Sequence, residues 1–121
     1  MSNSGADVVV VGAGSSGAVV AARLAAAGAD VVLVEAGPDY GPLDAGRWPE
    51  ELLDATALAT THDWGYRSGD RWTFERARVL GGCSAHNGAI AAVGHRDDYD
   101  AWNLPGWTTY ELRPFFATAL E

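Results

Sequence analysis

The 121-residue sequence contains no lysine, and its eight basic residues are all arginine. The 16 Asp and Glu residues outnumber them, so the formal net charge is −8. This charge argues against nucleic acid or an anionic membrane as a partner, because both bind through clusters of basic side chains. A small phosphorylated ligand stays compatible with it, since backbone N–H groups at the start of a helix bind phosphate without lysine.

Cysteine is also scarce, because Cys83 is the only one. A single cysteine excludes an intrachain disulfide and a metal site built on several thiolates. The first apolar stretch, residues 8–11, is too short for the core of a signal peptide, and no apolar run approaches the ~20 residues of a membrane span. We therefore expect a cytoplasmic protein without a membrane span. His62 and His95 lack ligand spacing, so no metal site is expected.

The first part of the chain has the pattern of a β-α-β unit. Residues 7–11 and 30–34 are dominated by valine, which predicts two parallel strands, each buried on both faces. Residues 16–27 are rich in alanine and predict a helix between them, which Gly28 ends in a left-handed conformation. The expected fold is therefore α/β and Rossmann-like, with a parallel sheet. One such unit is an incomplete sheet, so we expect the remaining strands outside these residues.

A glycine motif lies between the first strand and the helix, with the spacing Gly12-x-Gly14-x-x-Gly17, and Glu35 ends the second strand. Gly12 permits the turn, Gly14 lets the backbone approach a pyrophosphate, and Gly17 lets helix and strand pack closely. The N–H groups and the dipole of the helix start then hold the phosphates. The Glu35 carboxylate can accept hydrogen bonds from both ribose hydroxyls. Together these residues predict a site for a dinucleotide with an unphosphorylated ribose.

The pattern becomes irregular after the second strand. Gly-Pro pairs interrupt it, only residues 50–59 have a helical pattern, and long irregular segments in compact domains are typically functional covers. Residues 87–93 are apolar and partly regular, and helices are predicted at 96–102 and 108–120. Three acids, Asp97, Asp98 and Asp100, fit a solvated helix start better than a calcium loop. The tryptophans are interpreted as packing residues; they are Trp48, Trp64, Trp72, Trp102 and Trp107.

A second motif decides which dinucleotide is expected. Residues 76–88, RARVLGGCSAHNG, resemble the first signature of the glucose-methanol-choline (GMC) oxidoreductases. Further stretches resemble that family in the same order: VEAGP at 34–38, HDWGY at 62–66, DYDAW at 98–102, GW at 106–107 and RPFF at 113–116. The resemblance implies FAD as the cofactor and oxidation of a small-molecule alcohol by hydride transfer to the flavin. Oxygen or another electron acceptor would then reoxidise the flavin.

The resemblance also assigns residues to the cofactor. Around the pyrophosphate it places Gly12, Gly14, Ser15, Ser16 and Gly17, with Glu35 at the adenosine ribose. On the flavin side it places Gly81, Gly82, Cys83, Ser84, His86, Asn87 and Gly88, where glycine lets a flat ring approach the backbone. Arg78 fits either a contact with FAD or an ion pair with a neighbouring carboxylate. The family's catalytic pair lies near its C-terminus, so no catalytic residue is assigned to these 121 residues.

Cys83 and His86 depart from the commonest family pattern, which has serine and an apolar residue there. In one branch of the family the corresponding histidine is bonded covalently to the flavin, so His86 is a candidate for such a bond. A histidine that packs beside dissociable FAD is the alternative. Cys83 is interpreted as a small residue beside the cofactor rather than a reactive thiol.

The expected organisation is the N-terminal part of an FAD-binding domain, without the substrate domain. Its segments are a β-α-β unit at 1–37, a cofactor-covering excursion at about 38–74, a flavin-contact motif at 75–94 and a helical segment at 95–121. We expect such a fragment to be inactive alone. Two other interpretations stay open, namely an NAD-dependent Rossmann dehydrogenase and a non-enzymatic flavin-binding fragment or subunit that needs a partner.

Overall fold

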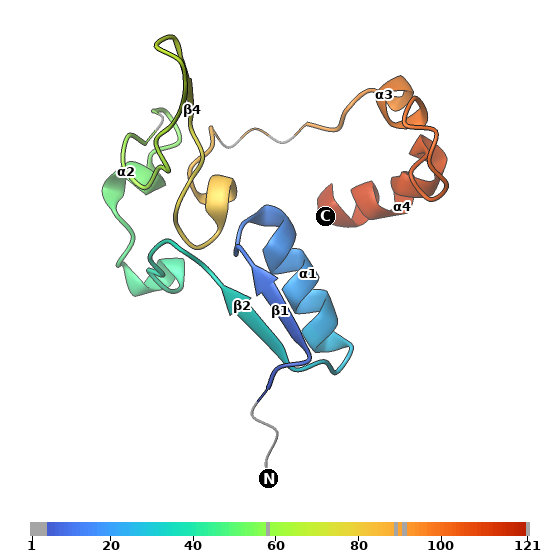
Figure 1. The fold of residues 1–121 in the computed structure, drawn as a ribbon, viewed down its shortest axis with the longest axis horizontal. Helices are drawn as coiled ribbons and strands as arrows, with labels where there is room; N and C mark the ends of the chain where they lie inside the picture. Colours follow the sequence, from blue (N-terminus) through green and yellow to red (C-terminus); the bar gives the residue numbers. More distant parts are fainter. Residues whose placement is uncertain (1–4, 58, 89, 91, 121) are drawn as a thin grey trace. The chain divides into compact units, whose positions relative to one another are not determined.

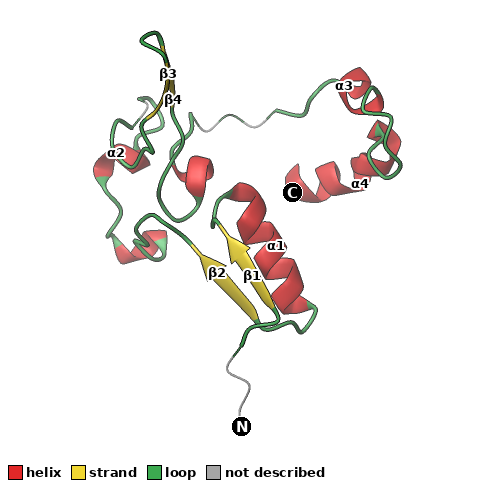
Figure 2. Cartoon of the chain, viewed as in Figure 1, coloured by secondary structure: helices red, strands yellow, loops and turns green. Residues whose placement is uncertain are grey.

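The computed structural model describes residues 5–57, 59–88, 90 and 92–120. The chain divides into two compact units, Met1–Ala89 and Ile90–Glu121. Figure 1 follows the chain through both, and Figure 2 distinguishes its helices and strands from its loops. Among the described residues, no helix is long and apolar enough to cross a membrane.

The first unit begins with the predicted β-α-β unit, formed by β1 (Val8–Val11), α1 (Ser15–Ala26) and β2 (Val31–Val34). The two strands pair in parallel from Val8 opposite Val31 to Val11 opposite Val34. The helix α1 packs against both strands. The α/β fold with a parallel sheet is confirmed, and each element ends within one residue of its prediction.

The conformation at the C-terminal end of α1 explains why this end could be predicted from the sequence. Gly28 has a φ of +93°, a left-handed conformation that glycine adopts without a steric penalty. Its N–H group donates to Ala25 O at 3.0 Å, and the N–H group of Ala29 donates to Leu24 O at 3.1 Å. These two bonds satisfy carbonyl groups that the helix leaves free at its end. The prediction that Gly28 ends the helix is confirmed.

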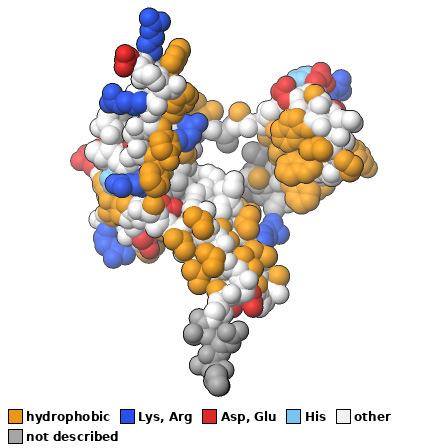
Figure 3. Space-filling view, in the orientation of Figure 1, with side chains coloured by type: hydrophobic (Ala, Val, Ile, Leu, Met, Phe, Trp, Pro, Cys, Tyr) orange, Lys and Arg blue, Asp and Glu red, His pale blue; other side chains and the backbone are white. Residues whose placement is uncertain are grey.

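The prediction that both strands are buried on both faces is wrong for this chain. Val9 is 59% exposed and Val11 is 82% exposed, and the side chains of Val32 to Val34 are also exposed. The reason is that α1 covers one face, while the described residues put only two strands in this sheet. Figure 3 shows hydrophobic side chains gathered on the surface that β1, β2 and α1 form.

The segment after β2 is more regular than predicted. It contains the short helices η1 (Leu43–Ala45) and α2 (Glu50–Leu53), followed by an antiparallel hairpin of β3 (Tyr66–Ser68) and β4 (Trp72–Phe74). Sequence reasoning missed the hairpin, since strands of three residues are too short to show an alternating pattern.

The helix α2 is shorter than the predicted 50–59. Asp54 follows it in an extended conformation and accepts the N–H group of Thr56 at 2.8 Å. An aspartate that hydrogen-bonds its own backbone two residues on favours a turn over a helix. After β4 the chain forms one more short helix, η2 (Gly82–Ala85).

The second unit contains α3 (Arg96–Asp100) and α4 (Thr109–Leu120). Both predicted helices are confirmed, although α3 is shorter than predicted. Asp97 and Asp98 lie in the first turn of α3, which confirms their interpretation as a helix start. The Tyr99 ring connects the helices, because its centroid lies 5.4 Å from that of Trp102 and 5.2 Å from that of Phe116. The described residues within 87–93 form no helix or strand, contrary to the prediction.

Candidate dinucleotide site

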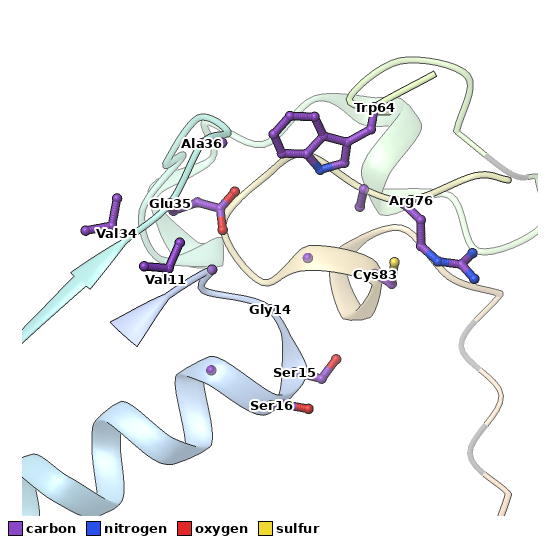
Figure 4. A pocket seen from close by; sticks show the side chains of 14 residues that line it. Val11, Gly14, Ser15, Ser16, Val34, Glu35, Ala36, Trp64, Arg76 and Cys83 are labelled. Carbon is purple, nitrogen blue, oxygen red and sulfur yellow. The ribbon is translucent and has the colours of Figure 1, made fainter. Parts of the chain in front are cut away.

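A cavity of about 550 Å³ opens where β1 and β2 end and α1 begins (Figure 4). In α/β proteins, ligands bind at this edge of a parallel sheet. The cavity is lined by Val11, Gly12, Gly14, Ser15, Ser16, Gly17, Val34, Glu35, Ala36, Trp64, Arg76, Ala77, Gly82 and Cys83. It therefore brings together residues of both glycine motifs with the acid that ends β2.

The turn from β1 to α1 depends on two of its glycines. Gly12 has a φ of +94°, and its N–H group donates to Val34 O at 2.7 Å, which ties the turn to the end of β2. A Cβ atom on Gly17 would lie 1.9 Å from Gly12 O, so only glycine fits there. The first turn of α1 therefore packs directly on the end of β1, as the close-packing role of Gly17 predicts.

The start of α1 is suited to an anion. Gly14 is its N-cap, no side chain caps it, and its first turn contains no acidic residue. Its first N–H groups lack partners within the helix, and the positive end of the helix dipole lies there. Gly14 has a φ of −80°, and a Cβ atom on it would approach only Gly82, at 3.7 Å from Cα. No protein atom therefore crowds the backbone at Gly14, which leaves space for a pyrophosphate to approach it.

The Glu35 carboxylate, which is half-buried, is fixed by two backbone groups. Its Oε2 accepts the N–H group of Ala13 at 2.8 Å, and its Oε1 accepts that of Gly37 at 2.8 Å. The side chain therefore joins the glycine turn to the turn after β2. Each carboxylate oxygen has a second lone pair, so both oxygens can still accept a ribose hydroxyl.

The second glycine motif packs on the first. The N–H group of Gly81 donates to Ala13 O at 2.9 Å, and the Ser15 and Ser84 hydroxyls are hydrogen-bonded. A Cβ atom on Gly82 would lie 2.7 Å from Gly14 Cα. The sequence pattern predicts that these glycines let the flavin approach the backbone. In the structure Gly82 also packs against Gly14.

The turn after β2 also packs on this motif. A Cβ atom on Gly37 would lie 2.2 Å from the carbonyl carbon of Arg78, and the N–H group of Leu80 donates to Pro38 O at 3.0 Å. The stretches quoted at 34–38 and 76–88 are therefore neighbours in space, although 37 residues of chain separate them in the sequence.

Several residues predicted on the flavin side do not line this cavity; they are Gly81, Ser84, His86, Asn87 and Gly88. Arg78, predicted to contact either FAD or a carboxylate, does not line it either. The Arg78 guanidinium lies 5.8 Å from the centre of the Trp64 ring, and within the described ranges it forms no ion pair. His86 is only 8% exposed, and its Nε2 atom has no hydrogen-bond partner among the residues described. Ser84 and Asn87 line a separate cavity with Trp48 and Leu52.

Six lining residues were missed by sequence reasoning: Val11, Val34, Ala36, Trp64, Arg76 and Ala77. The valines and Ala36 are the flanks of motifs that the sequence did identify. Among the described residues of the lining, Arg76 is the only one with a cationic side chain and Trp64 the only one with an aromatic side chain. The Trp64 stretch was part of the family resemblance, but nothing local in the sequence indicates that it reaches the glycine motifs. In the described part of the chain, no cluster of His, Cys, Asp and Glu could hold a metal ion.

Comparisons with known proteins agree with this geometry. A sequence profile of the "NAD(P)-binding Rossmann-like domain" matches residues 10–69. Choline oxidase from Arthrobacter globiformis is 39% identical over 125 residues, which cover 91% of this chain and 22% of that protein. Oxygen-dependent choline dehydrogenase from Brucella anthropi is 36% identical over 123 residues, covering 92% of this chain and 22% of that protein.

Solved structures give the same result. Pyridoxine 4-oxidase from Mesorbium loti superposes with a TM-score of 0.75 and 30% identity, covering 93% of this chain and 24% of that one. Formate oxidase superposes with a TM-score of 0.69 and 28% identity, covering 91% of this chain and 21% of that one. The chain belongs to the glucose-methanol-choline (GMC) oxidoreductase family. It corresponds to the N-terminal FAD-binding region of GMC proteins, and it spans 22% of the length of the curated relatives above.

The extent of the profile match bears on the choice between FAD and NAD. It covers residues 10–69 and so ends before the second glycine motif of this GMC chain. Residues 76–88, whose motif favours FAD over NAD, lie outside it. The choice of FAD therefore depends on the GMC relatives and on the packing of the second motif against the first.

Proposed function

We propose that this chain supplies the FAD-binding part of an enzyme that oxidises an alcohol to an aldehyde or ketone. The observation that carries the proposal is the cavity at the start of α1, where an uncapped helix end, the Glu35 carboxylate and the second glycine motif converge. When bound, FAD supplies the hydride acceptor. The GMC relatives, oxidases and dehydrogenases by name, support this reaction class.

In this proposal the residues of the chain bind and orient the cofactor. The N–H groups at the start of α1 hold the pyrophosphate, and Gly14 leaves the backbone accessible to it. Glu35 accepts hydrogen bonds from the adenosine ribose while it stays bonded to Ala13 and Gly37. Arg76, which was not predicted, adds a positive charge to a cavity that binds an anionic ligand. Gly82 and Cys83 line the part of the cavity contributed by the second motif.

The alternative dinucleotide is NAD, and the matched profile is compatible with it. The second motif favours FAD. The Gly81 to Ala13 bond and the Ser15 to Ser84 contact hold this motif against the first one. Gly82 and Cys83, which lie between Gly81 and Ser84, line the same cavity. This second motif is the stretch that resembles the first signature of the GMC family.

We further propose that His86 is the covalent attachment point of the flavin. Its Nε2 atom is buried and lacks a partner among the described residues, and burial of an unpaired ring nitrogen is costly. The imidazole nitrogen would act as the nucleophile and would replace a hydrogen of the flavin, and the two protons and two electrons released would pass to the electron acceptor that the proposed activity requires. Dissociable FAD beside a packed histidine is the competing arrangement, and it predicts a flavin that acid releases.

The experiment that tests the main proposal is purification of the full-length enzyme that contains these residues. We expect the visible absorption of an oxidised flavin, and bleaching of that absorption when an alcohol substrate is added without oxygen. A colourless protein that binds NAD after attempted reconstitution with FAD would contradict the proposal. A flavoprotein that is reduced by NADH but by no alcohol would contradict the reaction class alone.

A further inference from the structure

We infer that Trp64 is a cofactor-contacting residue whose indole packs against the adenine at the adenosine end of the dinucleotide. The inference rests on the proposed function. It assigns to Trp64 a role that neither the glycine motifs nor Glu35 can provide, namely a flat apolar surface. Trp64 is the only aromatic residue among the described residues that line the cavity, and it is 46% exposed. Figure 4 shows its indole beside the space bounded by Glu35 and Ala36.

The backbone around Trp64 is held by a short antiparallel contact with the start of the second motif. The N–H group of Trp64 donates to Arg76 O at 3.0 Å, and that of Arg78 donates to His62 O at 2.6 Å. Asp63 lies opposite Ala77 in the same contact. Since 76–78 leads directly into Gly81 and Gly82, this contact places Trp64 beside the cavity.

The Asp63 carboxylate reinforces the placement. Its Oδ1 accepts the N–H group of Gly65 at 2.5 Å, and its Oδ2 accepts that of Arg76 at 2.6 Å. These bonds fix the residues on both sides of the point where Trp64 enters the cavity. An exposed tryptophan on such a backbone loses little further conformational freedom when a ligand arrives.

The indole ring itself is oriented by two neighbours. It is parallel to the Tyr66 ring, with an interplanar angle of 2° and a centroid separation of 6.0 Å. The Arg78 guanidinium lies 5.8 Å from its centre, a cation–π distance. The side chain is therefore oriented before any ligand binds, although nearly half of its surface is accessible to one.

Two observations place its ligand at the adenosine end. Trp64 shares the cavity wall with Glu35 and Ala36, and Glu35 is the residue proposed for the adenosine ribose. A base attached to that ribose must lie within a few ångströms of the carboxylate. A purine presents a flat π-face, and stacking of a base on an aromatic side chain is sequence-tolerant and strong. Adenine is therefore the part of the cofactor that fits Trp64.

The test uses the apo form of the full-length enzyme in a His86→Asn background, where FAD binding is dissociable, with FAD and ADP as probes. Trp64→Ala should weaken the binding of both by the same factor, roughly 5- to 100-fold, which is the usual effect of removing one stacking partner. Trp64→Phe should restore most of the affinity. Trp72→Ala is the matched control, because Trp72 is on the hairpin that follows Trp64, is 69% exposed and does not line the cavity.

A second readout does not depend on the alanine variant folding well. ADP should change the tryptophan emission of the wild-type enzyme, and Trp64→Phe should abolish that change while ADP still binds. Equal effects of Trp64→Ala and Trp72→Ala would overturn the inference, and so would a loss of FAD affinity without a loss of ADP affinity. If ADP and FAD bind but Trp64 variants change nothing, the proposed function stands and this inference fails. If FAD does not bind the wild-type enzyme, both fail.

Discussion

Gly82 lies against Gly14 so closely that a Cβ atom on Gly82 would be 2.7 Å from Gly14 Cα. The reverse contact is loose, because a Cβ atom on Gly14 would lie 3.7 Å from Gly82 Cα, an ordinary van der Waals distance. Gly82 also has a φ of +57°, whereas Gly14 has a φ of −80°. The two glycines therefore have separable roles. Position 82 must be glycine for the protein to pack. Position 14 must be glycine only for a ligand to enter the cavity.

Gly14→Ala and Gly82→Ala should consequently have different effects. The Gly14→Ala variant should have the unfolding temperature of the wild type. Its affinity for FAD should fall by about tenfold or more, since a methyl group would occupy the pyrophosphate position. Gly82→Ala should lower the free energy of unfolding by about 2 kcal/mol, because of its backbone clash and its left-handed conformation. Denaturant unfolding of the apo protein and the flavin content of each variant measure the two effects. Equal destabilisation by both substitutions would contradict the assignment.

Glu35→Gln should weaken both the turn and the cofactor site. The amide nitrogen of glutamine cannot accept a hydrogen bond, so Ala13 or Gly37 loses its partner. We expect a loss of about 1–3 kcal/mol in the free energy of unfolding, the usual cost of an unsatisfied partly buried group. Glu50→Gln on α2 is the control, since Glu50 is an exposed acid in the same unit. FAD affinity should fall for Glu35→Gln alone, and unchanged amide exchange at Ala13 and Gly37 would disprove the structural part of this prediction.

His86→Asn tests the covalent flavin. In the wild-type enzyme, acid precipitation should leave the flavin with the protein, and the tryptic peptide that contains His86 should carry its mass. In the variant, acid should release all of the flavin, while dissociable binding continues through the start of α1 and Glu35. Complete release from the wild-type enzyme together with an unmodified His86 peptide would refute the covalent bond. Asparagine retains a polar side chain at this buried position, so loss of folding is not the expected result.

The start of α4 should respond to pH through Glu111. The hydroxyl and N–H groups of Thr108, together with the N–H group of Gly106, lower the pKa of Glu111 below its ordinary value. A carboxyl with a lower pKa in the folded state stabilises that state above its ordinary pKa. The contribution is lost as the pH falls through the folded-state pKa. Thr108 and Glu111 also have the spacing of a capping box, which supports a helix start.

An NMR titration of the carboxyl groups measures this effect. Thr108→Ala should raise the pKa of Glu111 towards its ordinary value. Asp54 is an internal control, because the hydroxyl and N–H groups of Thr56 lower its pKa in the other unit. The pKa of Asp54 should be the same in Thr108→Ala and in the wild type, and a shift in both groups would point to general unfolding instead.

The β-α-β unit could be predicted from the sequence because each of its signals is local. Consecutive valines, an alanine-rich helix and Gly28 each determine the conformation of adjacent residues, and the structure places every end within one residue of its prediction. The burial of the strands could not be predicted in this way. Burial depends on what covers a sheet, and the described residues leave Val9 and Val11 exposed.

Part of the candidate site could also be predicted from the sequence, and part could not. Gly12, Gly14, Gly17 and Glu35 belong to a motif whose spacing alone encodes its geometry, and all of them line the cavity. Trp64 does not belong to any such motif. It reaches the cavity through an antiparallel contact between 62–64 and 76–78, and a contact between segments this far apart leaves no periodic signal in either of them.

The hydrogen bonds of Asp63 hold the residues at the base of the β3–β4 hairpin, and they do not involve the hairpin itself. Gly65 and Arg76 are fixed on the cavity side, while β3, β4 and the residues between them are exposed along their whole length. The tip at Gly69 and Asp70 can therefore be lengthened, replaced or chemically labelled without disturbing the cradle at Gly14. It offers an attachment point for immobilising this chain on a surface, with the tether kept clear of the residues that would hold the cofactor.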